Sequence, residues 1–129
     1  MSVSPKTAGA LVATGITGAD LSTNPVTDPM LADGYSTLKL RVDLTRGGAA
    51  TDVGVSKLEE SDDGVTWSRV QRDTAGVLVN YAATHATTAN SVVSIILDVS
   101  PYVYVRATIS GTAATSSDLV TATARLVQG

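Results

Sequence analysis

Strict alternation of apolar and polar residues is the feature that most constrains how this chain folds. Residues 38–45 read Leu-Lys-Leu-Arg-Val-Asp-Leu-Thr, so that every second side chain is apolar. Successive side chains of a β-strand point to opposite faces, and a period of two therefore predicts a strand with one buried and one solvated face. No segment shows a sustained apolar period of about 3.6 residues, which argues against helices. The sequence predicts an all-β protein.

Three further segments alternate in the same way, at residues 92–99, 102–110 and 119–127. Residues 53–61 alternate with a slip between Val55 and Leu58, which a β-bulge near Ser56 and Lys57 would explain. Residues 77–79 predict a short strand, whereas residues 82–90 are small and polar and predict a loop. About seven or eight strands at this spacing predict an antiparallel two-sheet β-sandwich, either immunoglobulin-like or jelly-roll-like.

The first 34 residues differ from the rest in composition. They are low in charge and rich in Ala, Gly, Thr and Pro, and they contain the turn-forming pairs Asn24-Pro25, Asp28-Pro29 and Asp33-Gly34. Turns this close together exclude a long regular element, although residues 8–14 suit a short strand. We interpret residues 1–34 as an extended N-terminal arm that lies across the domain or a neighbour, and residues 35–129 as the β-sandwich domain. A first edge strand with loops inside the same sandwich is the alternative.

Composition limits the classes of function. The chain has 129 residues, no Cys and no Phe, one Trp, four Tyr, and a net charge of −3 with acids and bases interspersed. This length predicts one domain, and the lack of Cys excludes disulfides and thiolate metal sites. Nucleic-acid binding needs clustered Lys and Arg, which are absent. The apolar runs are too short for a membrane helix and make a poor signal peptide, so we expect neither a membrane protein nor export by that route.

The densest charge and the only Trp lie together at residues 58–72. Residues 61–67 read Ser-Asp-Asp-Gly-Val-Thr-Trp, and an Asp-Gly pair between extended segments predicts a hairpin because Gly tolerates positive φ. A two-residue loop would place Glu60 opposite Trp67, and a three-residue loop would place Glu59 there. Both registers stay open.

This segment resembles the Asp-box hairpin of sialidase-type propellers, Ser-x-Asp-x-Gly-x-Thr-Trp, with one residue fewer between Asp63 and Gly64. A propeller needs repeated blades, and the chain holds a single copy of the motif and no internal repeat. The resemblance implies that Ser61 and Asp63 bond the turn backbone at Gly64 while Trp67 packs beneath it. An exposed tip that contacts a partner is the functional alternative.

The clearest indication of binding in the sequence is a stripe of side chains suited to contact another protein. Tyr102, Tyr104 and Arg106 alternate along one predicted strand and form an outward aromatic and cationic stripe, a composition found at protein interfaces. The alternative is that this face packs inside the protein or is simply solvated. Together with Leu11 and Val12 of the arm, these residues are the candidate interface.

Catalysis and metal binding have little support. His85 is the only His and no Gly-x-Ser-x-Gly elbow accompanies it, which argues against a hydrolytic triad. A calcium loop at residues 59–63, completed by Asp43 or Asp52, lacks the spacing of an EF-hand, although the sequence does not exclude calcium there. We expect no enzyme, no cofactor and no metal site.

Three segments together resemble small β-sandwich structural proteins of tailed bacteriophages, such as capsid decoration (cement) proteins and tail or connector components. They are the Glu-Ser-Asp-Asp-Gly-Val-Thr-Trp hairpin, the Asp-Val-Ser-Pro-Tyr-Val-Tyr-Val-Arg-Ala strand entry from residue 98, and the Ser-Gly-Thr-Ala-Ala-Thr-Ser turn from residue 110. The similarity covers roughly residues 36–127. It implies a non-enzymatic virion part that is made in the host cytoplasm and assembles in symmetric copies, and it supplies no catalytic residues.

The expected function is therefore that of a virion structural protein, first of all a capsid decoration protein. Its partners would be the major capsid protein or other virion proteins, and it would be a homo-oligomer. A tail or head-to-tail connector component is the first alternative. A carbohydrate- or host-surface-binding module, using the Asp63 and Trp67 tip or the tyrosine stripe, is the second.

Overall fold

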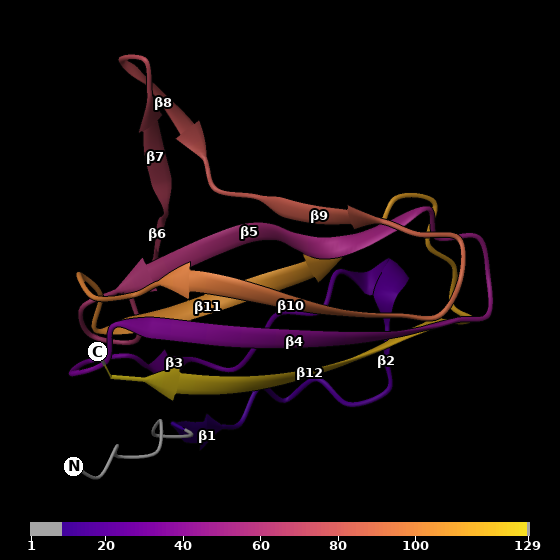
Figure 1. Ribbon diagram of the computed structural model, residues 1–129, viewed down its shortest axis with the longest axis horizontal. Helices are drawn as coiled ribbons and strands as arrows, with labels where there is room; N and C mark the ends of the chain where they lie inside the picture. The colour runs from indigo at the N-terminus through magenta and orange to yellow at the C-terminus, as the bar shows by residue number, and fades with distance from the viewer. Residues whose placement is uncertain (1–8, 129) are drawn as a thin grey trace, which may run out of the picture.

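Two antiparallel β-sheets pack face to face in this protein, and a separate hairpin projects from them (Figure 1). The structure, a computed structural model, describes residues 9–128. The all-β sandwich predicted from the alternating sequence is confirmed. Within the described residues there are twelve strands and one short 3-10 helix, η1 (Leu21–Thr23). The number exceeds the seven or eight expected because several strands are only two to four residues long.

The first sheet has the strand order β1-β12-β4-β10, with β2 also beside β12. Its central strand β4 is paired along its whole length with β12 on one side, and over residues 37–44 with β10 on the other. All of these pairs are antiparallel. The strands are β1 (Ala10–Val12), β2 (Ala19–Asp20), β4 (Thr37–Arg46), β10 (Ser91–Asp98) and β12 (Asp118–Val127).

The second sheet has the order β3-β11-β5-β6, with β9 also beside β5. Its strands are β3 (Met30–Leu31), β5 (Asp52–Ser61), β6 (Ser68–Arg69), β9 (Ala83–Ala86) and β11 (Tyr104–Ser110). The two strands of the projecting hairpin are β7 (Gln71–Thr74) and β8 (Val77–Asn80), and they form a small sheet of their own.

The apolar positions of the alternating segments form the core between the sheets. On β4, Leu38, Leu40 and Val42 are fully buried, whereas Lys39 and Arg41 are exposed. β10, β11 and β12 alternate in the same way. Burying a Val, Leu or Ile side chain contributes roughly 1.5–3 kcal/mol relative to leaving it exposed. The aliphatic side chains therefore stabilise a core that contains no Phe.

The slip in the alternation of β5 is a β-bulge at the expected position. β11 pairs Thr108 with Lys57 and then Ile109 with Val55, so Ser56 is the extra residue of β5. Residues three apart on a regular strand point to opposite faces. The bulge instead brings both Val55 and Leu58 into the core.

Residues 9–34 run along the edges of both sheets. β1 and β2 lie beside β12 of the first sheet, and β3 lies beside β11 of the second sheet. The segment contributes four buried residues to the common core, Ile16, Leu21, Met30 and Ala32. Of the two arrangements expected for this part of the chain, the structure has edge strands and loops within the same sandwich. Residues 1–8 of the expected arm lie outside the described residues.

The expectation of a loop throughout residues 82–90 is wrong, because β9 forms there and pairs with the edge of β5. A Cβ atom on Gly54 would lie 2.1 Å from the carbonyl oxygen of Ala83. The absence of a side chain at Gly54 therefore lets β9 approach β5. Small residues carry no clear apolar alternation, so the local pattern gives no sign of this pairing.

One buried carboxylate holds the Gly-rich connection between β4 and β5. Asp118 is fully buried and accepts hydrogen bonds from the backbone N–H groups of Gly48 and Thr115 at 2.9 Å, and of Ala49 and Ala50 at 3.1 Å. These bonds favour the ionised carboxylate and lower the pKa of Asp118, the bond from Thr115 most. The start of β12 is thereby tied to the loop that leaves β4.

Candidate interaction surfaces

The turn between β5 and β6 is built by its own side chains. The Ser61 hydroxyl accepts a hydrogen bond from the backbone N–H of Gly64 at 2.9 Å. Asp63 Oδ1 accepts from the N–H groups of Val65 and Thr66, each at 2.8 Å. The Thr66, Val65 and Ser61 donors, in that order, lower the pKa of Asp63 to about 2. Gly64 has a φ of +77°, which a residue without a Cβ adopts at little cost.

Both registers expected for this hairpin are wrong. Glu60 pairs with Ser68 and Glu59 pairs with Arg69, so residues 62–67 all belong to the connection. In this longer connection the backbone N–H groups of the turn donate to the Ser61 and Asp63 side chains. In a tighter hairpin they would bond across the strands. Trp67 consequently lies outside the strand pair.

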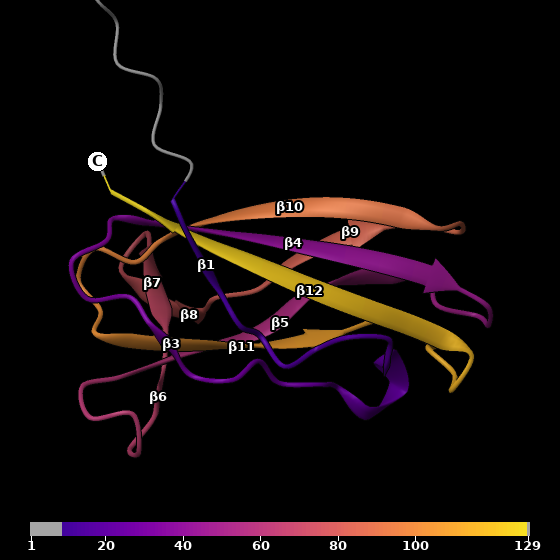
Figure 2. The ribbon, with the colours of Figure 1, turned by 90° about the horizontal axis from the view of Figure 1, so that it is seen from below.

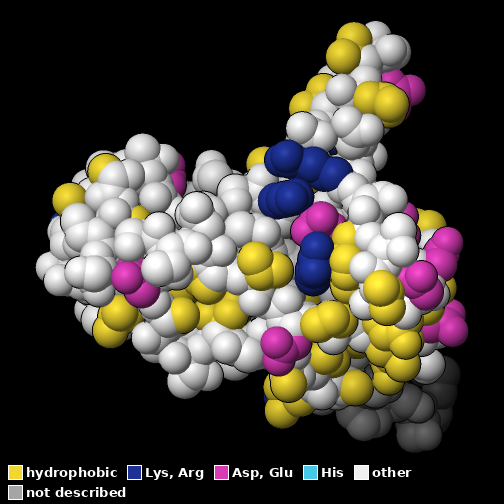
Figure 3. All heavy atoms as spheres, turned by 180° about the vertical axis from the view of Figure 1, so that it is seen from behind, with side chains coloured by type: hydrophobic (Ala, Val, Ile, Leu, Met, Phe, Trp, Pro, Cys, Tyr) yellow, Lys and Arg dark blue, Asp and Glu magenta, His cyan; other side chains and the backbone are white. Residues whose placement is uncertain are grey.

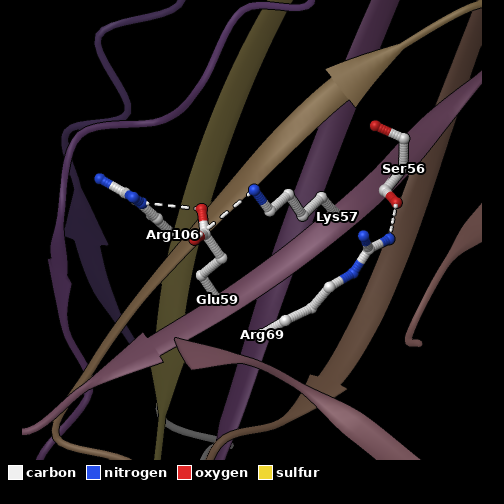
Figure 4. A network of polar contacts seen from close by, with 5 residues as sticks. All are labelled: Ser56, Lys57, Glu59, Arg69 and Arg106. Atoms are coloured by element: carbon white, nitrogen blue, oxygen red, sulfur yellow. Dashed lines mark hydrogen bonds and ion pairs between the residues drawn. The ribbon is translucent and has the colours of Figure 1, made fainter. Parts of the chain in front are cut away.

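Trp67 lies against Arg106 of β11. The guanidinium carbon of Arg106 is 4.3 Å from the centroid of the Trp67 ring. Arg106 Nε also donates to Glu59 Oε1 at 3.0 Å, and Lys57 Nζ is 3.7 Å from Glu59 Oε2. Figure 4 shows Glu59 between these two basic side chains. The hydrogen bond from Arg106 is the main cause that lowers the pKa of Glu59.

Tyr104 belongs to the same surface, but Tyr102 does not. The Tyr104 ring comes within 3.6 Å of the point where a Cβ on Gly64 would stand. Tyr102 precedes β11 in a turn, its N–H donating to the Val99 carbonyl at 2.9 Å, and its side chain packs against the core. Burial is the main cause that raises the pKa of Tyr102. The predicted three-residue stripe is therefore broken by the turn at Pro101.

The candidate interface residues of the N-terminal segment lie on the other sheet. Leu11 is 67% exposed on the outer face of the first sheet, directly opposite Arg125 of β12. Val12 is half-buried and packs against the core. The five interface candidates from the sequence thus do not form one surface.

We call the group formed by Glu59, Trp67, Tyr104 and Arg106 the Trp67 surface.

One edge of β5 pairs with β11, and the opposite edge pairs with two short separate strands that leave a gap between them. β6 pairs with residues 59–60 and β9 pairs with residues 52–55. In the gap, Arg69 donates from Nη2 to the Ser56 carbonyl at 3.2 Å (Figure 4). The chain leaves the sandwich after β6, forms the β7–β8 hairpin and returns in β9 (Figure 1). The hairpin is therefore an insertion in an edge strand.

The base of the hairpin is anchored and the rest is exposed. Val70 N–H donates to the Leu58 carbonyl at 2.8 Å, and Tyr81 N–H donates to the Val70 carbonyl at 3.0 Å. The guanidinium of Arg72 lies over the Tyr81 ring, 4.9 Å from its centroid. Beyond this base, every residue from 71 to 80 is exposed. Figure 3 shows the hairpin standing clear of the body, with hydrophobic side chains along it.

Three consecutive apolar residues of β8 are exposed on this hairpin. Val77 is 62%, Leu78 66% and Val79 46% exposed. A two-stranded hairpin is at best marginally stable by itself, and grouped exposed apolar side chains mark surfaces that contact partners. The sequence predicts the strand at residues 77–79. It does not predict the exposure, because an apolar run ordinarily indicates burial.

The residues considered for catalysis or metal binding are distributed over both sheets and the β5–β6 turn. His85 is exposed on β9. Glu59 of the second sheet forms an ion pair with Arg106, and Asp43 of the first sheet forms one with Arg41. Asp52 accepts from the N–H and hydroxyl groups of Thr112 at 2.7 and 2.8 Å. Within residues 9–128, no group of three or more His, Cys, Asp or Glu side chains is placed to hold a metal ion.

The fold defines the chain as an all-β sandwich with a hairpin inserted at one edge. No protein-family model matches it, and neither the curated proteins nor the solved structures include a match. In the part of the chain that the structure describes, no helix is long and apolar enough to span a membrane.

Proposed function

We propose that this protein is a non-enzymatic structural component of a tailed-bacteriophage virion, namely a capsid decoration protein that attaches to the shell by protein–protein contacts. The observation that carries the proposal is the β7–β8 hairpin, which projects from the sandwich with Val77, Leu78 and Val79 exposed. The similarity of three sequence segments to small virion sandwiches supplies the biological context. In this role the protein works in many copies on the virion and needs no cofactor, nucleic acid or membrane.

The two strands of the hairpin suit different roles. β7 carries Arg72 and Asp73, whereas β8 reads Val-Leu-Val-Asn and has no charge. Proteins usually protect a free strand edge with charge, Pro or a bulge. The uncharged edge of β8 therefore suits the addition of a strand from the shell protein, in which main-chain hydrogen bonds give affinity and the apolar side chains give specificity.

The test is co-sedimentation with purified shells of the encoding phage that lack this protein. We expect the wild-type chain to bind and Leu78→Asp to lose at least tenfold in affinity, because a charge would enter the apolar contact. Val92→Asp is the matched control, since Val92 is 60% exposed on β10 and lies outside the hairpin. Circular dichroism checks that both variants fold. A wild-type chain that never sediments with shells, or a Leu78→Asp variant that binds equally well, would overturn the proposal.

Two other assignments would follow from different outcomes. Labelled protein seen on the tail or at the head-to-tail junction in particle micrographs would identify a tail or connector component. The partly exposed Trp67 and Tyr104 rings favour a carbohydrate- or host-surface-binding module as the candidate from another class. Glycan-array binding that disappears in Trp67→Ala, with the fold intact, would support that module.

A further inference from the structure

A row of four directly paired residues crosses the outer face of the first sheet. Leu11 of β1 is opposite Arg125 of β12, Arg125 is opposite Lys39 of β4, and Lys39 is opposite Ile96 of β10. Two cations thus stand side by side between two aliphatic residues that are 67% and 61% exposed. We call this set the basic row. Like charges directly opposite on neighbouring strands are destabilising.

The basic row lacks a carboxylate of its own. Among residues 9–128, Arg41 is paired with Asp43 at 3.1 Å, and neither Lys39 nor Arg125 takes part in an ion pair. Leu11, Lys39, Arg41 and Arg125, together with Thr123, line a cavity of about 240 Å³. A ligand that carried a carboxylate beside an apolar group would relieve the repulsion and cover the exposed aliphatic side chains.

The β5–β6 turn of the same protein combines carboxylates with an exposed apolar side chain. Asp62 and Asp63 are exposed there, and Val65 is 79% exposed. Asp63 remains ionised well below neutral pH, because three donors hold its pKa at about 2. Figure 2 shows the turn extending beyond the second sheet, on the side away from the first sheet. It is therefore both acidic and accessible.

One molecule cannot bring the two features together. The basic row lies on the outer face of the first sheet, and the turn belongs to the second sheet. We propose that the β5–β6 turn of one copy docks on the basic row of a second copy, with Asp62 and Asp63 facing Lys39 and Arg125 and with Val65 beside Leu11. Such a contact joins two different patches, so it is heterologous and generates a ring or an open chain of subunits.

The contact is small and polar, and this determines how it behaves. Stable interfaces bury roughly 1,200–2,000 Å² in total, which one turn on one row does not reach. We therefore expect weak association that becomes visible at high protein concentration and weakens as salt screens the charges. On a crowded surface the same contact would link neighbouring copies.

Sedimentation velocity of the pure protein over a wide range of concentrations tests the proposal, without any shell present. Lys39→Glu and Asp62→Lys should each weaken self-association at least tenfold, and the chain carrying both changes should regain most of it, because the charges are then exchanged. Asp33→Lys is the control, since Asp33 is an exposed acid in the loop between β3 and β4. Thermal unfolding checks the fold of each variant.

The outcomes separate this contact from the shell-binding role. A wild-type chain that stays monomeric at every soluble concentration would overturn the proposal, and so would association that Lys39→Glu leaves unchanged. Loss in both single variants without recovery in the combined variant would also overturn it. Shell binding through Leu78 is measured in a different assay, so either proposal can fail while the other holds.

Discussion

Replacing Arg106 by Met tests whether the Trp67 surface stabilises the sandwich. The change removes the guanidinium but retains an unbranched side chain. The wild-type side chain is 31% exposed and its partner Glu59 is 12% exposed, so this pair is more shielded than an ordinary surface ion pair. A hydrogen bond to a charged group contributes about 1.5–3 kcal/mol and a cation–π contact about 0.5–1 kcal/mol. Because Lys57 still compensates Glu59 in part, we expect Arg106→Met to lower the free energy of unfolding by about 2–3 kcal/mol at pH 7.

The same interaction predicts a pH dependence. Arg106 lowers the pKa of Glu59 in the folded protein below its ordinary value of 4.5. A carboxyl with a lowered folded-state pKa contributes stability above its unfolded pKa and loses it as the pH falls through the folded pKa. The stability difference between wild type and Arg106→Met should therefore be complete above about pH 5 and shrink as the pH falls below about 4.

Urea denaturation of a double-mutant cycle with Glu59→Gln measures the coupling directly, at pH 7 and at pH 3. The pair of Arg41 and Asp43 is the control, because its side chains are 53% and 42% exposed at a similar distance of 3.1 Å. Exposed pairs of this kind are worth about 0–1 kcal/mol. A coupling of Arg106 and Glu59 no larger than that of the control pair, or one that does not diminish at pH 3, would refute the reasoning.

Three shorter predictions concern the core, the sheet edge and the buried carboxylate. Leu40→Ala should lower the free energy of unfolding in urea by about 2–5 kcal/mol, because Leu40 is fully buried. Gly54→Ala should displace β9, so that amide hydrogen exchange at residues 83–86 accelerates while exchange on β4 does not; unchanged protection would contradict the close approach. Asp118→Asn should lower the Tm by roughly 5–10 °C at pH 7 because it weakens four backbone bonds. Since the pKa of Asp118 is lowered, calorimetry should also show that wild type loses more stability than the variant between pH 7 and pH 2.

The sequence predicts those elements whose signal is local. The alternation at residues 38–45 predicts both β4 and the inward side chains Leu38, Leu40 and Val42. The slip between Val55 and Leu58 predicts a bulge, which the structure has at Ser56. In each case the prediction depends only on adjacent residues of one segment, because the alternation with a period of two is a property of a single strand.

What the sequence does not predict depends on partners that are distant along the chain. β9 forms because Gly54 leaves room for it, and Asp118 is buried because the loop after β4 supplies three N–H donors. The contact of Trp67 with Arg106 follows from a wider turn than an Asp-Gly pair indicates. The basic row has the same origin, since only the register of four strands brings Leu11, Arg125, Lys39 and Ile96 into line.

The candidate contacts are placed so that the fold does not depend on them. The β7–β8 hairpin pairs only with itself beyond its base, and the basic row is on the solvent side of strands whose inner side chains form the core. A change at Leu78 or Lys39 therefore alters a surface without opening a cavity, whereas a change at Leu40 does the reverse. A loss of binding in a Leu78 or Lys39 variant can therefore be attributed to the lost contact and not to unfolding. In the assembly proposed above, the subunit can therefore fold before either contact forms.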